Sequence, residues 1–194
     1  MSSSPVEDLA RAAHVTGDLV AGVGDDQWGR PTPCTDWTVR DLVNHLVGGH
    51  LRFAAALSGE EPPPDAARRA DHLGEDPAAA YLASAKTVLA AFRSPGAMER
   101  VIAVPIGSVP GSVALHLSLV EALVHGWDLA HATNQQFRAD EEVAEQELQF
   151  TQAQLSRVPP GHSPFQPPQP VAEDAPAADR LAGLLGREVP TATT

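Results

Sequence analysis

Apolar residues recur every three or four positions along four long stretches of the chain, with polar or small residues between them. The stretches cover residues 7–23, 38–57, 77–92 and 112–133. This is the spacing of an α-helix that buries one face and exposes the other. The pattern therefore predicts an all-α protein built on four long helices.

Residues with helix-terminal preferences mark the ends of these stretches. Thr38 and Asp41 form a capping-box pattern at the start of the second helix, and Pro77 suits the first turn of the third. Gly24 supplies a stop after the first helix. These signals support separate helices joined by loops.

The segments between and after these helices differ from them in composition and pattern. Residues 59–77 are proline-rich and acidic and predict a loop, whereas the β-branched residues of 100–111 predict a short strand or hairpin. Residues 140–158 are amphipathic, and 177–185 predict a short helix. We therefore expect one domain over residues 1–194: a four-helix bundle with a small β insertion and a C-terminal helix. Its tail, from about 159, is largely irregular and packs on the body.

Composition narrows the function. Lys and Arg number 13 against 25 Asp and Glu, a net charge of −12, which disfavours nucleic acids and anionic membranes as partners. No apolar stretch approaches the roughly 20 residues of a membrane span, and the acidic N-terminus lacks the features of a signal peptide. A cytoplasmic location is the resulting expectation. The single cysteine excludes an internal disulfide and a thiolate-only zinc cage, which leaves histidine and carboxylate ligands.

The helix predicted over 112–133 carries an unusual polar stripe. Ser118, Glu121, His125 and Asp128 fall on one narrow face of an otherwise apolar helix. Glu121 and His125 are four residues apart, so their side chains lie one turn apart on the same face. Such pairs are usually no more than a solvated contact. Apolar flanks favour a bound divalent ion instead, because unpaired buried polar groups cost about 1–3 kcal/mol each.

A third ligand is available on the second helix. His45 lies at the edge of the apolar stripe and can face a cleft, whereas His50 lies in its middle, as expected of a core histidine bonded to a backbone carbonyl. A site of His45, Glu121 and His125 has two nitrogens and one oxygen, the mixture typical of catalytic zinc with an open position. The other histidines lie at loop, terminal or exposed positions: His14, His72, His116, His131 and His162.

Four further residues near these motifs have more than one interpretation. Asp128 either orients His125 from behind or hydrogen-bonds near Trp127. Cys34 is expected to be a small buried residue rather than a nucleophile. Trp37 and Trp127 are expected to be core aromatics rather than substrate platforms.

Two segments carry a resemblance to a known family. TPCTDWTVRDLVNHLVGG (32–49) and VEALVHGWDLAHAT (120–133) resemble the metal-binding domain of the mycothiol-dependent maleylpyruvate isomerase family, in the DinB-like superfamily. The closing DAPAADRLAGLLGREVP (174–190) is similar to the end of single-domain members. The resemblance implies a four-helix DinB-like bundle with a divalent ion, usually zinc, at the positions that match here as His45, Glu121 and His125.

The resemblance also implies a chemistry. In this family the ion is thought to bind the thiol of mycothiol as thiolate, which implies thiol transfer to, or isomerisation of, an electrophilic small molecule. The isomerase itself has a further C-terminal domain that 194 residues cannot accommodate, so its substrate is not carried over. Residues 59–77, Arg180 and Arg187 are candidate contacts for the bulky, sugar-bearing thiol.

Three functions stay open from the sequence. The first is a metal-dependent mycothiol transferase or isomerase, as a monomer or homodimer. The second is a non-catalytic module that binds a ligand or protein, and the third is a metal-dependent hydrolase with Asp128 as a possible base. A structural metal site normally fills four protein positions, and only three are found here, which favours an enzyme.

Overall fold

The computed structural model describes residues 4–60, 70–104, 107–158 and 165–190. Four long helices form its body, close to their predicted positions: α1 (Pro5–Ala21), α2 (Val39–Leu57), α4 (Pro77–Phe92) and α5 (Gly111–Thr133). Helix α1 begins and ends two residues earlier than expected, because Pro5 at its first turn starts the helix. The all-α prediction is therefore confirmed.

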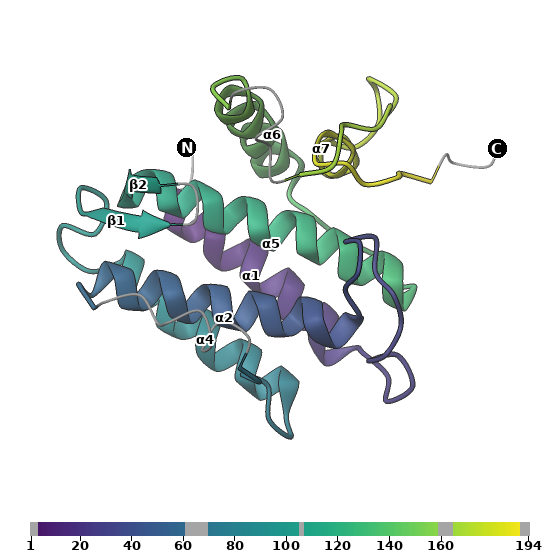
Figure 1. The fold of residues 1–194 in the computed structure, drawn as a ribbon, viewed down its shortest axis with the longest axis horizontal. Coiled ribbons are helices and arrows are strands. Elements are labelled where there is room, and N and C mark those ends of the chain that lie inside the picture. The colour runs from purple at the N-terminus through teal and green to yellow at the C-terminus, as the bar shows by residue number, and fades with distance from the viewer. Residues whose placement is uncertain (1–3, 61–69, 105–106, 159–164, 191–194) are drawn as a thin grey trace.

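The four long helices pack as a bundle in which each contacts two neighbours. Helices α4 and α5 each contact both α1 and α2. Figure 1 shows the four helices side by side. The predicted capping box is present at the start of α2, where Thr38 Oγ1 accepts a hydrogen bond from the backbone N–H of Asp41. This cap sets where α2 begins, and hence which of its residues face α5.

The predicted β insertion is a hairpin. Strands β1 (Val101–Val104) and β2 (Gly107–Pro110) pair antiparallel, and the turn between them lies outside the described residues. Ile102 is buried, and the hairpin contacts α5 and α2. It therefore lies across the end of the groove between those two helices.

Two further helices lie on the far side of α5 from α2. Helix α6 (Glu141–Leu155) and helix α7 (Ala177–Leu184) contact each other and α5 (Figure 1). Both end slightly earlier than the sequence pattern suggests. No helix among the described residues has the length and apolar character needed to cross a membrane.

Helix α5 is enclosed by its neighbours. It contacts α1, α2, α6, α7 and the hairpin, and its buried residues include the polar Ser118, His125 and Asp128. Thr16 of α1 donates a hydrogen bond to the Ala122 carbonyl of α5, so these two helices approach closely. Three of the four residues of the polar stripe are thus buried in the protein, and Glu121 is partly exposed.

Candidate metal centre between helices α2 and α5

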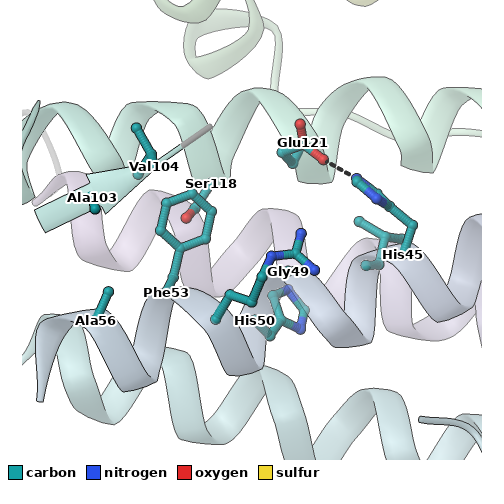
Figure 2. A pocket seen from close by; sticks show the side chains of 11 residues that line it. His45, Gly49, His50, Phe53, Ala56, Ala103, Val104, Ser118 and Glu121 are labelled. Atoms are coloured by element: carbon teal, nitrogen blue, oxygen red, sulfur yellow. Dashed lines mark hydrogen bonds and ion pairs between the residues drawn. The ribbon is translucent and has the colours of Figure 1, made fainter. Parts of the chain in front are cut away.

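Three predicted ligands meet between α2 and α5. His45 Nε2 of α2 lies 2.7 Å from Glu121 Oε2, and His125 Nε2 lies 3.4 Å from the same oxygen. One ligand atom from each of the three residues lies within 4.8 Å of the others. Figure 2 shows His45 and Glu121 pointing toward each other from facing helices. The four-residue spacing on α5 and the packing of α2 against α5 together produce this convergence.

The Glu121 carboxylate is the accessible member of the cluster. Its side chain is 41% exposed, against 8% for His125. Partial loss of surrounding water raises the pKa of Glu121, but hydrogen bonds from His125 and His45 outweigh this effect and hold the pKa well below its ordinary value. Glu121 is therefore an anion that two imidazoles approach, with one side open to a ligand.

Asp128 orients His125 from behind. The Nδ1–H of His125 donates to Asp128 Oδ2 at 3.0 Å, and Asp128 is fully buried. Burial lowers the pKa of His125, but its hydrogen bonds to Asp128 and Glu121 prevail and raise the pKa to about 9. Holding the proton on Nδ1 directs Nε2 toward Glu121. Of the two contacts weighed for Asp128, the structure contains the one with His125.

Arg187 completes this arrangement from the C-terminal tail. Its Nη2 and Nε lie 3.0 and 3.3 Å from the two oxygens of Asp128, in a buried bidentate pair. Burial raises the pKa of Asp128, but hydrogen bonds from His125 and Arg187 outweigh it and lower the pKa. An anion held by two cations is a poor general base, so the hydrolase role considered for Asp128 lacks support.

Of the two tail arginines that are candidate thiol contacts, only Arg187 lies near the site. Arg180 instead pairs with Glu145 of α6 and borders a different hollow. The prediction for the 59–77 loop cannot be followed throughout, because residues 61–69 lie outside the described part. No sequence signal linked Arg187 to Asp128, since 59 residues separate them.

Trp37 differs from its prediction as a core aromatic. It is partly exposed, and its ring centroid lies 4.6 Å from that of His45 and 5.6 Å from that of His125. Its position directly before the Thr38 cap indicated a residue at the helix entrance. Trp127 is buried as predicted, and its Nε1–H donates to Asp179. Trp37 therefore covers the two imidazoles, whereas Trp127 belongs to the core.

His50 is buried as predicted, but its partner is different. Its Nδ1 lies 3.0 Å from the hydroxyl of Ser84 on α4, not near a backbone carbonyl. The hydroxyl already donates to the Tyr81 carbonyl, so it accepts from His50. Burial lowers the pKa of His50 to about 4. His50 is a neutral core residue and is separate from the three converging ligands.

Cys34 is only half-buried and lies close to the site. Its Sγ lies within 4.8 Å of a ligand atom of both His125 and Asp128. Burial raises the pKa of its thiol to about 11, which keeps it protonated at neutral pH. The prediction that Cys34 is not a nucleophile is therefore consistent with its surroundings, although it is less buried than expected.

The remaining histidines lie away from the cluster. His116 was expected to be exposed, but its Nδ1 lies 2.8 Å from the buried Glu147 of α6. The Nδ1–H of His131 donates to the Trp127 carbonyl, and His14 is exposed beside Asp18. The backbone N–H of His72 donates to Asn44, and His162 lies outside the described residues.

Two cavities meet at the cluster, and His45 and Glu121 border both. The first, about 200 Å³, lies between α2, α5 and β1 (Figure 2). Its surface is mainly apolar, although His50, Arg52 and Ser118 also border it. The second, about 280 Å³, is more polar and includes Thr35 and Arg187 in its wall. The Glu121 carboxylate and the His45 imidazole thus lie between the two cavities.

Comparison with known proteins identifies the family. Residues 9–130 match the family described as the mycothiol maleylpyruvate isomerase N-terminal domain, which is more than half of the chain. The chain belongs to this family. Both segments that carried the resemblance fall within or overlap this span.

Two relatives are similar to this chain over nearly its whole length. Both are described as uncharacterized proteins of Mycobacterium tuberculosis, one from strain CDC 1551 and one from strain H37Rv. Each is 39% identical over 187 residues, which cover 95% of this chain and 98% of the relative. The likeness therefore extends through α6 and α7, beyond the family match.

Two solved structures share the fold. The crystal structure of the mycothiol-dependent maleylpyruvate isomerase matches with a TM-score of 0.61 at 20% identity, over 74% of this chain and 66% of the isomerase. A histidine-to-alanine mutant of that enzyme gives 0.62 at 19% identity, with the same coverage. This chain thus spans about two thirds of the isomerase. At this identity the match establishes the DinB-like fold alone.

Proposed function

We propose that this protein is a divalent-metal-dependent enzyme that uses mycothiol as cosubstrate and acts on an electrophilic small molecule, by thiol transfer or isomerisation. The observation that carries the proposal is the convergence of His45, Glu121 and His125, with His125 held by Asp128. The chain belongs to the family described as the mycothiol maleylpyruvate isomerase N-terminal domain, and this membership supports mycothiol as the cosubstrate.

The three side chains fit a divalent ion by their chemistry. Two imidazole nitrogens and one carboxylate oxygen suit zinc, and three protein ligands leave at least one position for a small molecule. The Nδ1–H bond from His125 to Asp128 is the outer contact that metal-bound histidines ordinarily make. Zinc is therefore our choice of ion.

A bound ion of this kind supplies a centre that lowers the pKa of a thiol and so provides a thiolate at neutral pH. The protein's own residues position the ligands of this ion. Asp128 and Arg187 fix the His125 ring, and the Trp37 ring packs against both imidazoles. Arg187 and Thr35 offer polar groups in the second cavity, which suits a sugar-bearing thiol.

The expected setting follows from this chemistry. The net charge of −12 disfavours nucleic acid as a partner, and small molecules are the proposed ligands. A thiol-dependent reaction suits the cytoplasm, where thiols stay reduced. We place the protein there.

Metal analysis of the purified protein tests the site. We expect about one divalent ion per chain in the wild type and loss of that ion in His45→Ala, Glu121→Gln and His125→Ala. Asp128→Asn removes the negative charge that His125 and Arg187 share and should weaken metal affinity about 10–100-fold without removing the site. Elemental analysis and chelator competition measure both effects.

The control variants are His131→Ala and His50→Gln, each of which alters a histidine outside the cluster and should keep the ion. A metal-free wild type, or equal metal loss in the controls, contradicts the site. Cobalt-substituted protein then tests the thiol, since thiol binding changes the cobalt absorption spectrum. If the spectrum is unchanged at saturating mycothiol and the protein cleaves an ester or amide without any thiol, the proposed transferase function is wrong and a hydrolase function takes its place.

A further inference from the structure

The cavity between α2, α5 and β1, here called the apolar chamber, has a size that limits what it can hold. Its walls include Phe53 and Ala56 of α2, Val104 of β1, and Ser118 and Glu121 of α5 (Figure 2). Its volume is about 200 Å³. An apolar protein cavity of about 150 Å³ holds benzene. The chamber therefore accommodates a molecule slightly larger than a single six-membered ring.

One polar atom in the chamber lacks a partner. Ser118 is 4% exposed, and its Oγ makes no hydrogen bond to any described residue. A helical serine commonly bonds the carbonyl four residues earlier, but Ser118 does not. An unsatisfied buried hydroxyl is energetically unfavourable, and a ligand oxygen that accepts its hydrogen bond removes this cost. Ser118 thus marks where a hydrogen-bonding group of a ligand belongs.

The chamber leads directly to the candidate metal centre. Ser118 lies three residues before Glu121 on α5, about 4.5 Å along the helix axis. A small molecule bonded to Ser118 therefore has its next atoms beside Glu121 and His45. Phe53, Ala56 and Val104 provide apolar surface around the rest. Arg52 also borders the chamber, so the charge preference needs a direct test.

We propose that the apolar chamber binds the electrophile of the reaction, and that this electrophile is an uncharged carbonyl compound about one ring in size. The assignment rests on the proposed function. The carbonyl oxygen accepts a hydrogen bond from Ser118 Oγ, and the apolar body contacts Phe53, Ala56 and Val104. The thiol approaches from the second, polar cavity, on the other side of His45 and Glu121.

An α,β-unsaturated ketone suits this arrangement. When a thiol adds to it, a C–S bond forms at the β-carbon and the electrons of the C=C bond move toward the carbonyl oxygen. The thiol proton finally occupies the α-carbon, so no other reactant is consumed. Ser118 donates to the oxygen on which negative charge develops, a contribution that strengthens during the reaction.

Binding of unreactive analogues tests the chamber without relying on turnover. Cyclohexanone has the expected size and oxygen, and methylenecyclohexane has the same shape without the oxygen. NMR titration of the wild type should locate cyclohexanone at Ser118 and Phe53. Ser118→Ala should weaken cyclohexanone binding about 3–10-fold, as expected for one neutral hydrogen bond, and leave methylenecyclohexane binding unchanged.

A matched control exists on α6. Thr151 also has a buried hydroxyl without a hydrogen-bond partner among described residues, but it lies outside the chamber. Thr151→Val should therefore leave cyclohexanone binding unaltered. Ala56→Leu, which fills the chamber from α2, should abolish binding of both analogues while metal content stays at the wild-type level.

The charge preference is tested with 3-oxocyclohexanecarboxylate, which should bind at least tenfold more weakly than cyclohexanone. Tighter binding of this acid, equal binding of cyclohexanone to Ser118→Ala, or perturbations away from the chamber would overturn the assignment. Metal content and thiol addition to 2-cyclohexenone are measured in parallel. Ketone binding without thiol addition overturns the proposed function alone, and thiol addition without chamber binding overturns this inference alone.

Discussion

Asp128 shows how a single side chain acquires its role from its neighbours. It contacts the imidazole of His125 on one side and the guanidinium of Arg187 on the other, and both contacts are buried. Two hydrogen-bonded cations keep the carboxylate charged despite its complete burial. As a fixed anion, Asp128 holds the His125 ring in one orientation. Its contribution to the site is therefore geometric rather than acid–base.

His50 should make stability depend on pH. Its pKa is about 4 in the folded protein, below the ordinary 6.5, so between these values the unfolded chain binds a proton that the native protein does not. Stability is therefore full above pH 6.5 and falls as the pH drops toward 4. The loss is about 2 kcal/mol at pH 5 and about 3 kcal/mol below pH 4.

Urea unfolding at pH 7 and pH 5 measures this effect. His50→Gln has no titrating group at this position, so its loss of stability on acidification should be smaller than that of the wild type by about 2 kcal/mol. Identical pH dependence in the two proteins would show that His50 does not titrate in this range.

At the scale of the elements, helix α5 determines the site. One of its faces packs closely against α1, and another carries the polar stripe. Gly126 lies one residue beyond His125, and a Cβ added there would lie 2.8 Å from both Thr16 Oγ1 of α1 and Cε2 of Phe137. The absence of a side chain thus permits the close approach of α1. That approach positions α5 in the bundle, with its polar stripe facing α2.

Gly126→Ala should therefore destabilise the protein although alanine favours helices. Overpacking at this contact is expected to cost about 1–3 kcal/mol, more than the helix-propensity gain of about 1 kcal/mol. Gly49→Ala is the matched control on α2, since its added Cβ meets only Arg52, at 3.8 Å. Urea unfolding should show a loss for Gly126→Ala and no loss for Gly49→Ala. Equal stability of the two variants would mean that α1 and α5 readily adjust.

At the scale of the whole molecule, the C-terminal tail is part of the centre. Helices α6 and α7 pack on α5 from the side away from α2 (Figure 1). The segment after α7 contains Arg187, which pairs with Asp128 of α5. Arg187 also borders the second cavity, together with Phe165 and Gln166 from before α7. The tail therefore contributes both to the orientation of His125 and to the wall of a cavity.

Two tail arginines allow a matched test of this role. Arg187→Ala leaves Asp128 buried without its guanidinium partner, which should lower the free energy of unfolding by about 3–5 kcal/mol and weaken metal affinity. Arg180→Ala removes the more exposed pair with Glu145, whose loss should cost at most about 1 kcal/mol and leave the metal unaffected. Urea unfolding and chelator competition measure both. Equal effects of the two substitutions would show that Arg187 has no special role at the metal centre.

The sequence alone determined the helices and the nominated ligands, because both depend on local periodicity. Capping residues and apolar spacing predicted α2, α4 and α5 nearly to the residue, and the four-residue spacing of Glu121 and His125 placed them on one face. His45 also followed from its position on a helical face. The metal that these residues are proposed to bind stays a prediction.

Only the tertiary structure decided which distant residues meet. The pairing of Asp128 with Arg187, the position of Trp37 over two imidazoles, the Ser84 partner of His50 and the apolar chamber at Ser118 all join segments that no periodicity links. Such contacts depend on how helices cross and where the tail returns. These are properties of packing between elements, and a pattern along one element contains no information about them.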